Sequence, residues 1–139
     1  MKVKKLSNTA SIPSRAHDSD AGYDLYADES IKIYPGQREL IATGIAIQLD
    51  KDMVGLIHPR SGLAVKHGIT VLNSPGTVDS GYTGEVKVNL INLGDVPFQV
   101  EQGDRIAQLV IQRVEHPSFT IVNELSDTDR GENGHGSTG

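Results

Sequence analysis

Apolar and polar side chains alternate along several short stretches of the chain. The alternation is clearest from Val86 to Leu90 and is repeated briefly from Ile31 to Ile33. Between Ile41 and Leu49, the apolar residues at 41, 45, 47 and 49 share one face. The run from Ile106 to Ile111 is more continuously apolar, which is typical of a strand buried on both sides. Because successive side chains of a strand point to opposite faces, these stretches predict β-strands.

Turns rich in glycine and proline separate these stretches, at residues 34–36, 74–76, 93–95 and 102–104. A helical pattern occurs from Gly62 to His67 and is short. Many short strands with regular turns predict an all-β sandwich or barrel. From Ser126 onward no apolar residue occurs, so this segment cannot offset its ordering entropy by burial. We therefore predict one β domain over residues 1–125 and a flexible, glycine-rich C-terminal arm over residues 126–139.

Composition narrows the choice of core and partner. With two Phe, four Tyr and no Trp among 139 residues, the core must consist mainly of Val, Ile and Leu. The net charge of −5 argues against a nucleic-acid partner, although a few Arg side chains suffice for a small anion. The absence of Cys excludes disulfides and thiolate metal sites. No apolar run is long enough for a signal peptide or a membrane span, so we expect a cytoplasmic protein without a membrane partner.

The glycine-rich end of the chain has two interpretations. Gly134 to Gly139 matches G-x-G-x-x-G, but no strand precedes it, and no Gly-Lys-Ser/Thr occurs anywhere. Both observations argue against a dinucleotide fold or a Walker-type phosphate loop. The segment is either a solvated tail or a flap over a polyphosphate. In a flap, the glycine N–H groups, the Ser137 and Thr138 hydroxyls and the Arg130 guanidinium would bind phosphate.

Two further stretches carry candidate chemistry, each with a plainer alternative. Arg60 and Ser61 stand at the start of the short helix, where unpaired N–H groups attract anions, unless Ser61 is simply the N-cap. Residues 73–84 have the composition of a hairpin with an elaborated turn. There Asp79 is a candidate general base, and Tyr82 offers a flat face to a sugar or base. The alternative is an Asx-turn aspartate beside a packed tyrosine.

Asp24 and Gln108 are polar residues within apolar stretches. Asp24 is a candidate for holding hydrated Mg²⁺, which prefers one or two carboxylates together with water and substrate phosphates. A solvent-facing strand residue is the alternative. The Gln108 amide is either satisfied by the backbone or faces a ligand. The five His residues show no metal-ligand spacing.

Taken together and in order, five stretches closely resemble the five motifs of the trimeric dUTPase family. They are Ala21 to Ala27, Pro59 to Gly68, Asn73 to Glu85, Gly103 to Leu109 and Arg130 to Gly139. The resemblance implies a jelly-roll-like β fold and a homotrimer with three active sites at subunit interfaces. It also implies that the arm of one subunit closes over another and that Mg²⁺-dependent hydrolysis converts dUTP to dUMP and pyrophosphate. That reaction lowers dUTP and supplies dUMP for thymidylate synthesis.

The resemblance also assigns roles at the phosphate end of the substrate. Asp24 would hold Mg²⁺ through coordinated water. The residues that would contact the phosphate chain are Arg60, Ser61, Gly62 and Gln108. Within the arm, Arg130, Ser137 and Thr138 would bind the γ-phosphate. The arm residues His135 and Gly136 would also contact the substrate.

At the nucleoside end, Asp79 would deprotonate the water that attacks the α-phosphorus and would also bond the 3′-hydroxyl. Tyr82 would pack under the deoxyribose and leave no room for a 2′-hydroxyl. The segment 73–86, whose backbone would read the uracil edge and exclude a 5-methyl group, contributes Asn73, Gly76, Val78 and Val86.

The fifth stretch departs from the family pattern Arg-Gly-x-Gly-Gly-Phe-Gly-Ser-Thr-Gly at two positions. Asn133 replaces a Gly and His135 replaces the Phe that stacks on uracil. Asn tolerates left-handed backbone conformations. An imidazole is flat but smaller than a phenyl ring, and it titrates near neutral pH. The hypothesis that follows is that His135→Phe raises the affinity for dUTP.

Three rival readings stay open at this point. A dCTP deaminase of related fold would use Glu85 as a proton shuttle, but Asp79 followed by Tyr82 and the arm fit a diphosphatase better. A non-catalytic nucleotide-sensing protein would use arm closure as its switch. A purely structural β domain would leave the ordered motifs unexplained.

Overall fold

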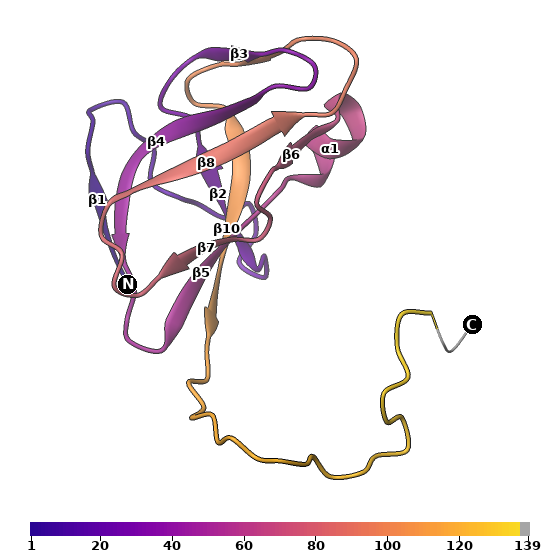
Figure 1. The fold of residues 1–139 in the computed structure, drawn as a ribbon. Helices are drawn as coiled ribbons and strands as arrows, with labels where there is room; N and C mark the ends of the chain where they lie inside the picture. The colour runs from indigo at the N-terminus through magenta and orange to yellow at the C-terminus, as the bar shows by residue number, and fades with distance from the viewer. Residues whose placement is uncertain (137–139) are drawn as a thin grey trace.

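Two antiparallel four-stranded sheets face each other as a sandwich (Figure 1). The computed structural model describes residues 1–136. The first sheet, in spatial order, consists of β1 Lys2–Lys5, β4 Arg38–Gln48, β8 Glu85–Asn92 and β6 Ile69–Val71. The second consists of β2 Gly22–Tyr26, β10 Arg105–Arg113, β5 Met53–His58 and β7 Gly76–Asp79.

A small third sheet and one helix complete the described part of the chain. The sheet pairs β3 Ile31–Ile33 with β9 Phe98–Val100, and the helix α1 Ser61–His67 precedes β6. Neighbouring strands are mostly distant in sequence, as β2 with β10 and β4 with β8 illustrate. This pattern is that of a jelly-roll-like sandwich, so the predicted all-β fold with one short helix is confirmed.

The core lies between the two sheets and is aliphatic, as the composition predicts. Along β8 every second side chain is buried, which confirms the alternation seen in the sequence. The largest fully buried side chains are Leu25, Ile33, Ile41, Ile45, Ile69, Leu90, Ile106, Leu109, Val86, Val88, Val100 and Asn92. The Asn92 amide is satisfied by the carbonyls of Ile33 and Val96, each 2.9 Å away.

Residues 106–111 were predicted to form a strand buried on both sides, and the strand is fully buried on one face only. Ala107 and Leu109 are buried, whereas Gln108 and Val110, which point the other way, are half-buried. β10 lies between β2 and β5, so both of its edges are hydrogen-bonded. The apolar run therefore reflects a central strand, and its outer face is free to line a pocket.

The predicted hairpin over residues 73–84 is wrong in its pairing. β7 pairs with β5 in the second sheet, with Gly76 opposite Ile57, while β8 pairs with β4 and β6 in the first. The reason is that Gly76 and Val78 are buried and turn their faces into the sandwich. Residues 80–84 therefore cross from one sheet to the other instead of reversing within one.

A bulge in β4 connects the N-terminal segment to β8. Gly44 has a φ of 65°, which favours glycine, and its N–H donates to the Glu85 carboxylate at 3.0 Å. On its other side, a β-carbon on Gly44 would overlap the carboxylate of Asp28. The hydrogen bond from the Ser7 hydroxyl is the main cause that holds the pKa of Asp28 below its ordinary value. The bulge thus holds the first residue of β8 through the Glu85 carboxylate.

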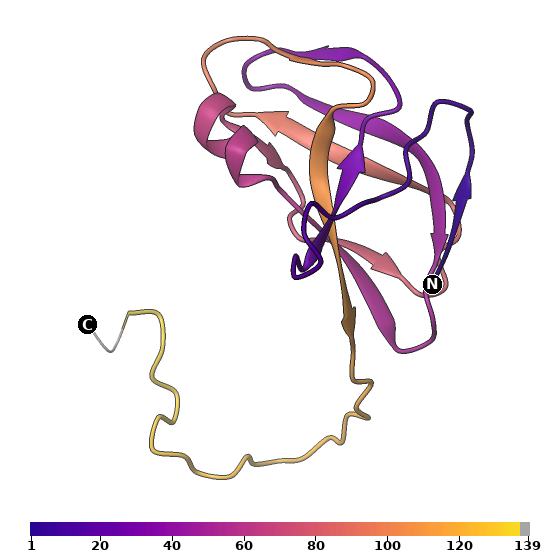
Figure 2. The same cartoon turned by 180° about the vertical axis from the view of Figure 1, so that it is seen from behind.

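The chain leaves the sandwich at the end of β10. Val114 donates to the Asp52 carbonyl at 3.0 Å, and residues 114–136 contain no helix or strand. Both views show this segment running away from the sheets (Figures 1 and 2). Two apolar residues of this segment are almost fully exposed to solvent: Phe119 is 98% exposed and Ile121 is 99% exposed. Within residues 1–136, no helix has the length and apolar character needed to cross a membrane.

Candidate functional site

The predicted site residues of the sandwich fall into two separate pockets. The Asp24 pocket is lined by Ala16, Asp20, Ala21, Gly22, Asp24, Arg60, Ser61, Gly62, Arg105 and Gln108. The Tyr82 pocket is lined by Leu40, Ile57, Asn73, Gly76, Thr77, Val78, Asp79, Tyr82, Glu85, Val86 and Lys87. The two pockets share no lining residue.

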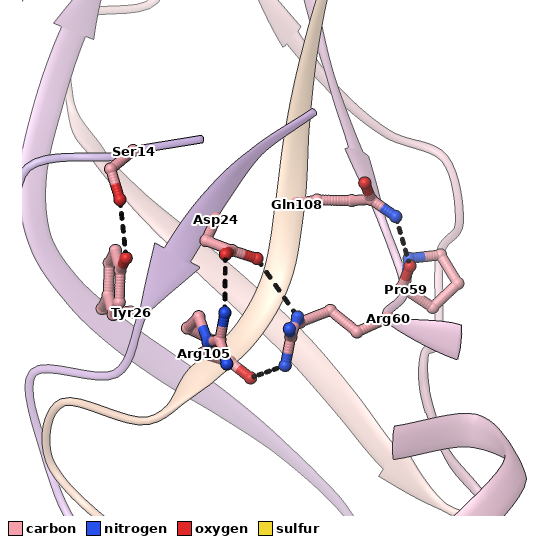
Figure 3. A network of polar contacts seen from close by, with 7 residues as sticks. All are labelled: Ser14, Asp24, Tyr26, Pro59, Arg60, Arg105 and Gln108. Atoms are coloured by element: carbon pink, nitrogen blue, oxygen red, sulfur yellow. Dashed lines mark hydrogen bonds and ion pairs between the residues drawn. The ribbon is translucent and has the colours of Figure 1, made fainter. Parts of the chain in front are cut away.

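In the Asp24 pocket, one carboxylate lies between two guanidinium groups (Figure 3). Arg60 Nε is 3.2 Å from one carboxylate oxygen of Asp24, and Arg105 Nη1 is 3.4 Å from the other. Arg60 also donates to the Arg105 carbonyl at 3.2 Å. The Asp24 side chain is 17% exposed. The carboxylates of Asp24 and Asp20 both line the pocket, and the two guanidinium groups supply hydrogen-bond donors that suit a polyanionic ligand.

The half-buried amide of Gln108 is satisfied by the backbone and also lies at a pocket. Its Nε2 donates to the Pro59 carbonyl at 3.0 Å, and its side chain also lines the Asp24 pocket (Figure 3). The side chain lies against Gly22 of the neighbouring strand. A β-carbon on Gly22 would overlap the Gln108 carboxamide oxygen and would lie 3.2 Å from its Cδ. The orientation of Gln108 therefore depends on a glycine of the neighbouring strand, the register partner of Val110.

The N-cap interpretation of Ser61 is wrong. The cap position of α1 is Arg60, with an extended backbone of φ −96° and ψ 126°, and no side chain of the described residues caps the helix. Ser61 is the first helical residue, and its exposed side chain lines the Asp24 pocket together with Gly62. Its hydroxyl is thus available to a ligand.

The Tyr82 pocket is formed by the crossing between β7 and β8. Asp79 ends β7 with an exposed carboxylate, and its carbonyl accepts the Tyr82 N–H at 3.0 Å. The Tyr82 hydroxyl donates to the Glu85 carbonyl at 2.8 Å. A β-carbon on Gly76, which is buried, would lie 3.3 Å from the Asn73 amide nitrogen, so a side chain at residue 76 would crowd Asn73. The pocket combines a carboxylate and an aromatic face with the Asn73 amide.

Strand register shows that the two pockets are far apart in one chain. Asp79 pairs with Val54 of β5. Asp24 pairs with Gln108 of β10, which pairs with His58 of β5. From Val54 to His58 is four residues along β5, and from β7 to β2 is three strand spacings. At about 3.3 Å per residue and 4.8 Å per spacing, Asp79 and Asp24 are roughly 20 Å apart.

Residues 126–136 of the arm run away from the sheets that carry both pockets (Figure 2). Arg130 Nε donates to the Asn133 carbonyl at 2.9 Å, and His135 has a positive φ of 51°. Gly136 is exposed. The predicted residues Ser137 and Thr138 lie outside the described part of the chain.

Arg105 is a pocket residue to which the sequence reasoning gave no role. It stands between Asp104 and the apolar run, where an ordinary surface arginine is the default expectation. One feature of the sequence could have pointed to Arg105: it lies in the same stretch, Gly103 to Leu109, as the candidate residue Gln108. Because β10 pairs with β2, the strand register turns Arg105 toward Asp24.

The donor groups in the Asp24 pocket fit Mg²⁺ held through water. In residues 1–136, no three His, Asp or Glu side chains gather closely enough to hold a metal ion alone. Two carboxylates line the pocket, those of Asp24 and Asp20, and one oxygen of Asp20 accepts the His17 N–H at 2.8 Å. One or two carboxylates suit an ion that takes its remaining ligands from water and from substrate phosphates.

Comparison with known proteins identifies the family. A family model described as dUTPase matches residues 8–139. The deoxyuridine 5′-triphosphate nucleotidohydrolase of Mycobacterium leprae (strain TN) is 55% identical, with 99% of this chain and 93% of that protein covered. The protein of that name from Corynebacterium glutamicum is 53% identical, with 100% and 94% covered.

Among solved structures, the dUTPase of Staphylococcus bacteriophage 80alpha with dUPNHPP superposes with a TM-score of 0.94 at 31% identity. The alignment covers 99% of this chain and 97% of the phage chain. The dUTPase of phage phi11 of S. aureus, as a variant studied for the coordination of a structural Mg(II) ion, superposes with a TM-score of 0.83 at 29% identity. It covers 88% of this chain and 96% of the phage chain. The chain therefore belongs to the dUTPase family.

Proposed function

We propose that the chain is a dUTP diphosphatase that hydrolyses dUTP to dUMP and pyrophosphate with Mg²⁺, as a homotrimer. The relatives at 53–55% identity bear the name of this activity over nearly their whole length. The single observation on which the assignment rests is the pair of pockets. One places two arginine side chains beside a carboxylate, and the other joins a carboxylate to an aromatic face.

The Asp24 pocket would bind the phosphate chain. Arg60 and Gln108 donate to phosphate oxygens, with Ser61 and the Gly62 backbone beside them. Asp24 would hold Mg²⁺ through water. When bound, that ion neutralises charge on the phosphates and on the departing pyrophosphate. Binding of the phosphates would also release Arg60 from part of its pairing with Asp24, now 3.2 Å away.

The Tyr82 pocket would bind the nucleoside. Tyr82 would pack under the deoxyribose, where a 2′-hydroxyl would collide with the ring. Uracil would be read by backbone groups, and the segment that carries them contains Asn73, Gly76, Val78 and Val86. A cytosine would leave hydrogen-bond groups of such a pocket unpaired, which is a strong means of rejection. A 5-methyl group would be excluded by lack of space.

Asp79 would act as the general base. Its carboxylate accepts a proton from a water molecule while the oxygen of that water forms a bond to the α-phosphorus. The bond from the α-phosphorus to the bridging oxygen breaks, and its electron pair leaves with pyrophosphate. The exposed end of β7 suits this role because the carboxylate must reach water and phosphorus together.

The separation of roughly 20 Å between Asp79 and Asp24 supports assembly from several subunits. A base acting through one water and a carboxylate acting through one hydrated ion cannot serve the same phosphorus across that span. We therefore place the Asp24 pocket of one subunit opposite the Tyr82 pocket of a neighbour. In a closed ring every pocket then finds its complement.

The segment after β10 supports the same assembly. Phe119 and Ile121 are almost fully exposed in one chain, and Leu125 is 88% exposed. Apolar side chains of this kind are expected to be covered in the working protein. Covered by a neighbouring subunit, they would carry the arm, residues 126–139, over that neighbour's site. Arg130, His135, Gly136, Ser137 and Thr138 would then meet the substrate and exclude water.

The deaminase alternative is disfavoured by the state of Glu85. One of its carboxylate oxygens accepts the Gly44 N–H at 3.0 Å, and the other lies 3.5 Å from Lys87 Nζ. Because both oxygens of the Glu85 carboxylate have partners, one of them in β4, the side chain serves to connect β4 with β8. It is therefore poorly placed to shuttle protons.

One set of assays tests the proposal. The protein is incubated with Mg²⁺ and either dUTP, dCTP, dTTP or UTP, and pyrophosphate and ammonia are followed. We expect pyrophosphate from dUTP alone. Ammonia from dCTP would establish the deaminase instead. The variant Asp79→Asn should lose about 10²- to 10⁴-fold in kcat at unchanged folding, and full activity would remove Asp79 as the base.

A further inference from the structure

The ring of Tyr82 lies directly across the backbone of Gly84, two residues further along the chain. A β-carbon on Gly84 would lie 2.6 Å from the Tyr82 hydroxyl oxygen, 2.7 Å from Cζ and 3.0 Å from Cε2. Ordinary carbon contacts are about 3.5–4.0 Å, so any side chain at residue 84 would displace the ring by about 1 Å. The ring occupies space that exists because residue 84 is glycine.

The backbone itself does not require glycine at this position. The φ of Gly84 lies outside the left-handed region, and the residue is exposed, so no core packing limits its size. Gly44, with φ of 65°, and Gly68, with φ of 67°, show what a conformational requirement looks like in this chain. For Gly84, the nearest obstacle to a side chain is the Tyr82 ring.

The hydroxyl of Tyr82 is tied to a fixed point. It donates to the Glu85 carbonyl at 2.8 Å, and Glu85 is the first residue of β8. The Glu85 carboxylate is anchored to the Gly44 N–H at the β4 bulge, which Asp28 supports from the other side. The Tyr82 side chain is itself 47% exposed and has few other constraints. Two features therefore set the position of the Tyr82 ring: the hydrogen bond to the Glu85 carbonyl, here called the tether, and the contact with the Gly84 backbone.

We propose that Gly84 is a specificity-determining positioning residue that acts through Tyr82. By lacking a side chain, it lets the ring lie back against the crossing loop, where the ring forms a wall of the Tyr82 pocket. The inference rests on the proposed function, in which this wall rejects a 2′-hydroxyl. With a methyl group at residue 84, the tether to Glu85 breaks and the exposed ring swings toward solvent. The wall is then no longer held, and ribonucleotides are admitted.

The test compares Gly84→Ala with Gly81→Ala. Both glycines are exposed residues of one loop, but a β-carbon on Gly81 meets no atom within 4 Å. For each variant, kcat/KM is measured for dUTP and UTP in the full-length enzyme with Mg²⁺. We expect the dUTP:UTP preference to fall by about tenfold or more in Gly84→Ala, because a misplaced wall loses discrimination. In Gly81→Ala the preference should stay within about twofold of the parent.

A second pair of variants separates this inference from the proposed function. Tyr82→Ala should abolish most of the preference, and Gly84→Ala should add nothing further in that background, since residues acting as one unit are non-additive. Tyr82→Phe, which removes the tether and keeps the ring, should lower the preference by a smaller factor.

If Tyr82→Ala lowers the preference and Gly84→Ala does not, the positioning role is wrong and the proposed function stands. If Tyr82→Ala leaves the preference unchanged, the role of Tyr82 in the proposed function fails, and the role of Gly84 fails with it. An equal loss in Gly81→Ala and Gly84→Ala would also overturn the inference, because the loop as a whole would then be responsible.

Discussion

The Asp24 pocket and the Tyr82 pocket are built in opposite ways. In the Asp24 pocket, long charged side chains from β2, β10 and the start of α1 hold one another by ion pairs. In the Tyr82 pocket, the shape comes from neighbours in sequence, through two backbone hydrogen bonds and glycines that leave room. The first is specified by strand register and the second by local chain geometry.

This difference in construction fits the two parts of the proposed substrate, the phosphate chain and the nucleoside. Paired charges on separate strands make a receptor for a charged, flexible phosphate chain, which tolerates small changes in position. An aromatic wall held by short contacts to the backbone suits a rigid nucleoside, because a small displacement of the wall changes the fit. Under the proposed function, the separation of roughly 20 Å requires each chain to contribute to two different sites.

The largest expected effect comes from mixing subunits that carry different defective pockets. A chain with Asp79→Asn and a chain with Arg60→Ala and Gln108→Ala should each fall below about 1% of parental activity. Co-expressed with two affinity tags and purified through both, the mixed assembly should recover roughly a third. In a ring of three that contains both chains, one interface joins two intact pockets.

The matched control for that experiment is co-expression of two differently tagged Asp79→Asn chains, which should stay inactive. A doubly purified mixed assembly as inactive as its parents would contradict the division of each site between subunits. Detection of both tags after the second purification verifies that both chains are present in one particle, and sedimentation gives the size of that particle.

A smaller effect is expected at Gly22, within the Asp24 pocket. Gly22→Ala places a methyl group against the Gln108 carboxamide, so the amide must leave its position beside Pro59. We expect KM for dUTP to rise about tenfold, corresponding to one hydrogen bond to a charged group, while dUMP binding changes little. In a Gln108→Ala background the substitution should have no further effect on KM, and an additive loss would show that Gly22 acts otherwise.

The smallest effect is expected on the arm, which belongs to neither pocket within one chain. If His135 covers the base, His135→Phe should lower the Kd for a non-hydrolysable dUTP analogue by about threefold, because a larger apolar ring buries more surface. Calorimetry of both proteins at one fixed pH gives the two dissociation constants. Equal or weaker binding would mean that His135 does not occupy the lid position.

Much of the fold was predictable from local patterns. The alternation at Val86 to Leu90 and at Ile31 to Ile33 corresponds to strands, and Gly62 to His67 lies within α1. The hairpin prediction for residues 73–84 failed because turn composition does not reveal the partner of the strand within it. β7 turns its buried side into the sandwich and pairs with β5, a choice made by residues about twenty positions away.

The candidate site was predictable as a set of residues but not as an arrangement. The sequence by itself determined the strands, the short helix and the chemistry of each motif, because side-chain period and residue type are local properties. Tertiary structure decided that the motifs fall into two distant pockets, that Arg105 meets Asp24, and that Gly84 faces Tyr82. The first two depend on strand register, which is settled by contacts between separate segments, and the third depends on how the loop after β7 folds back on itself.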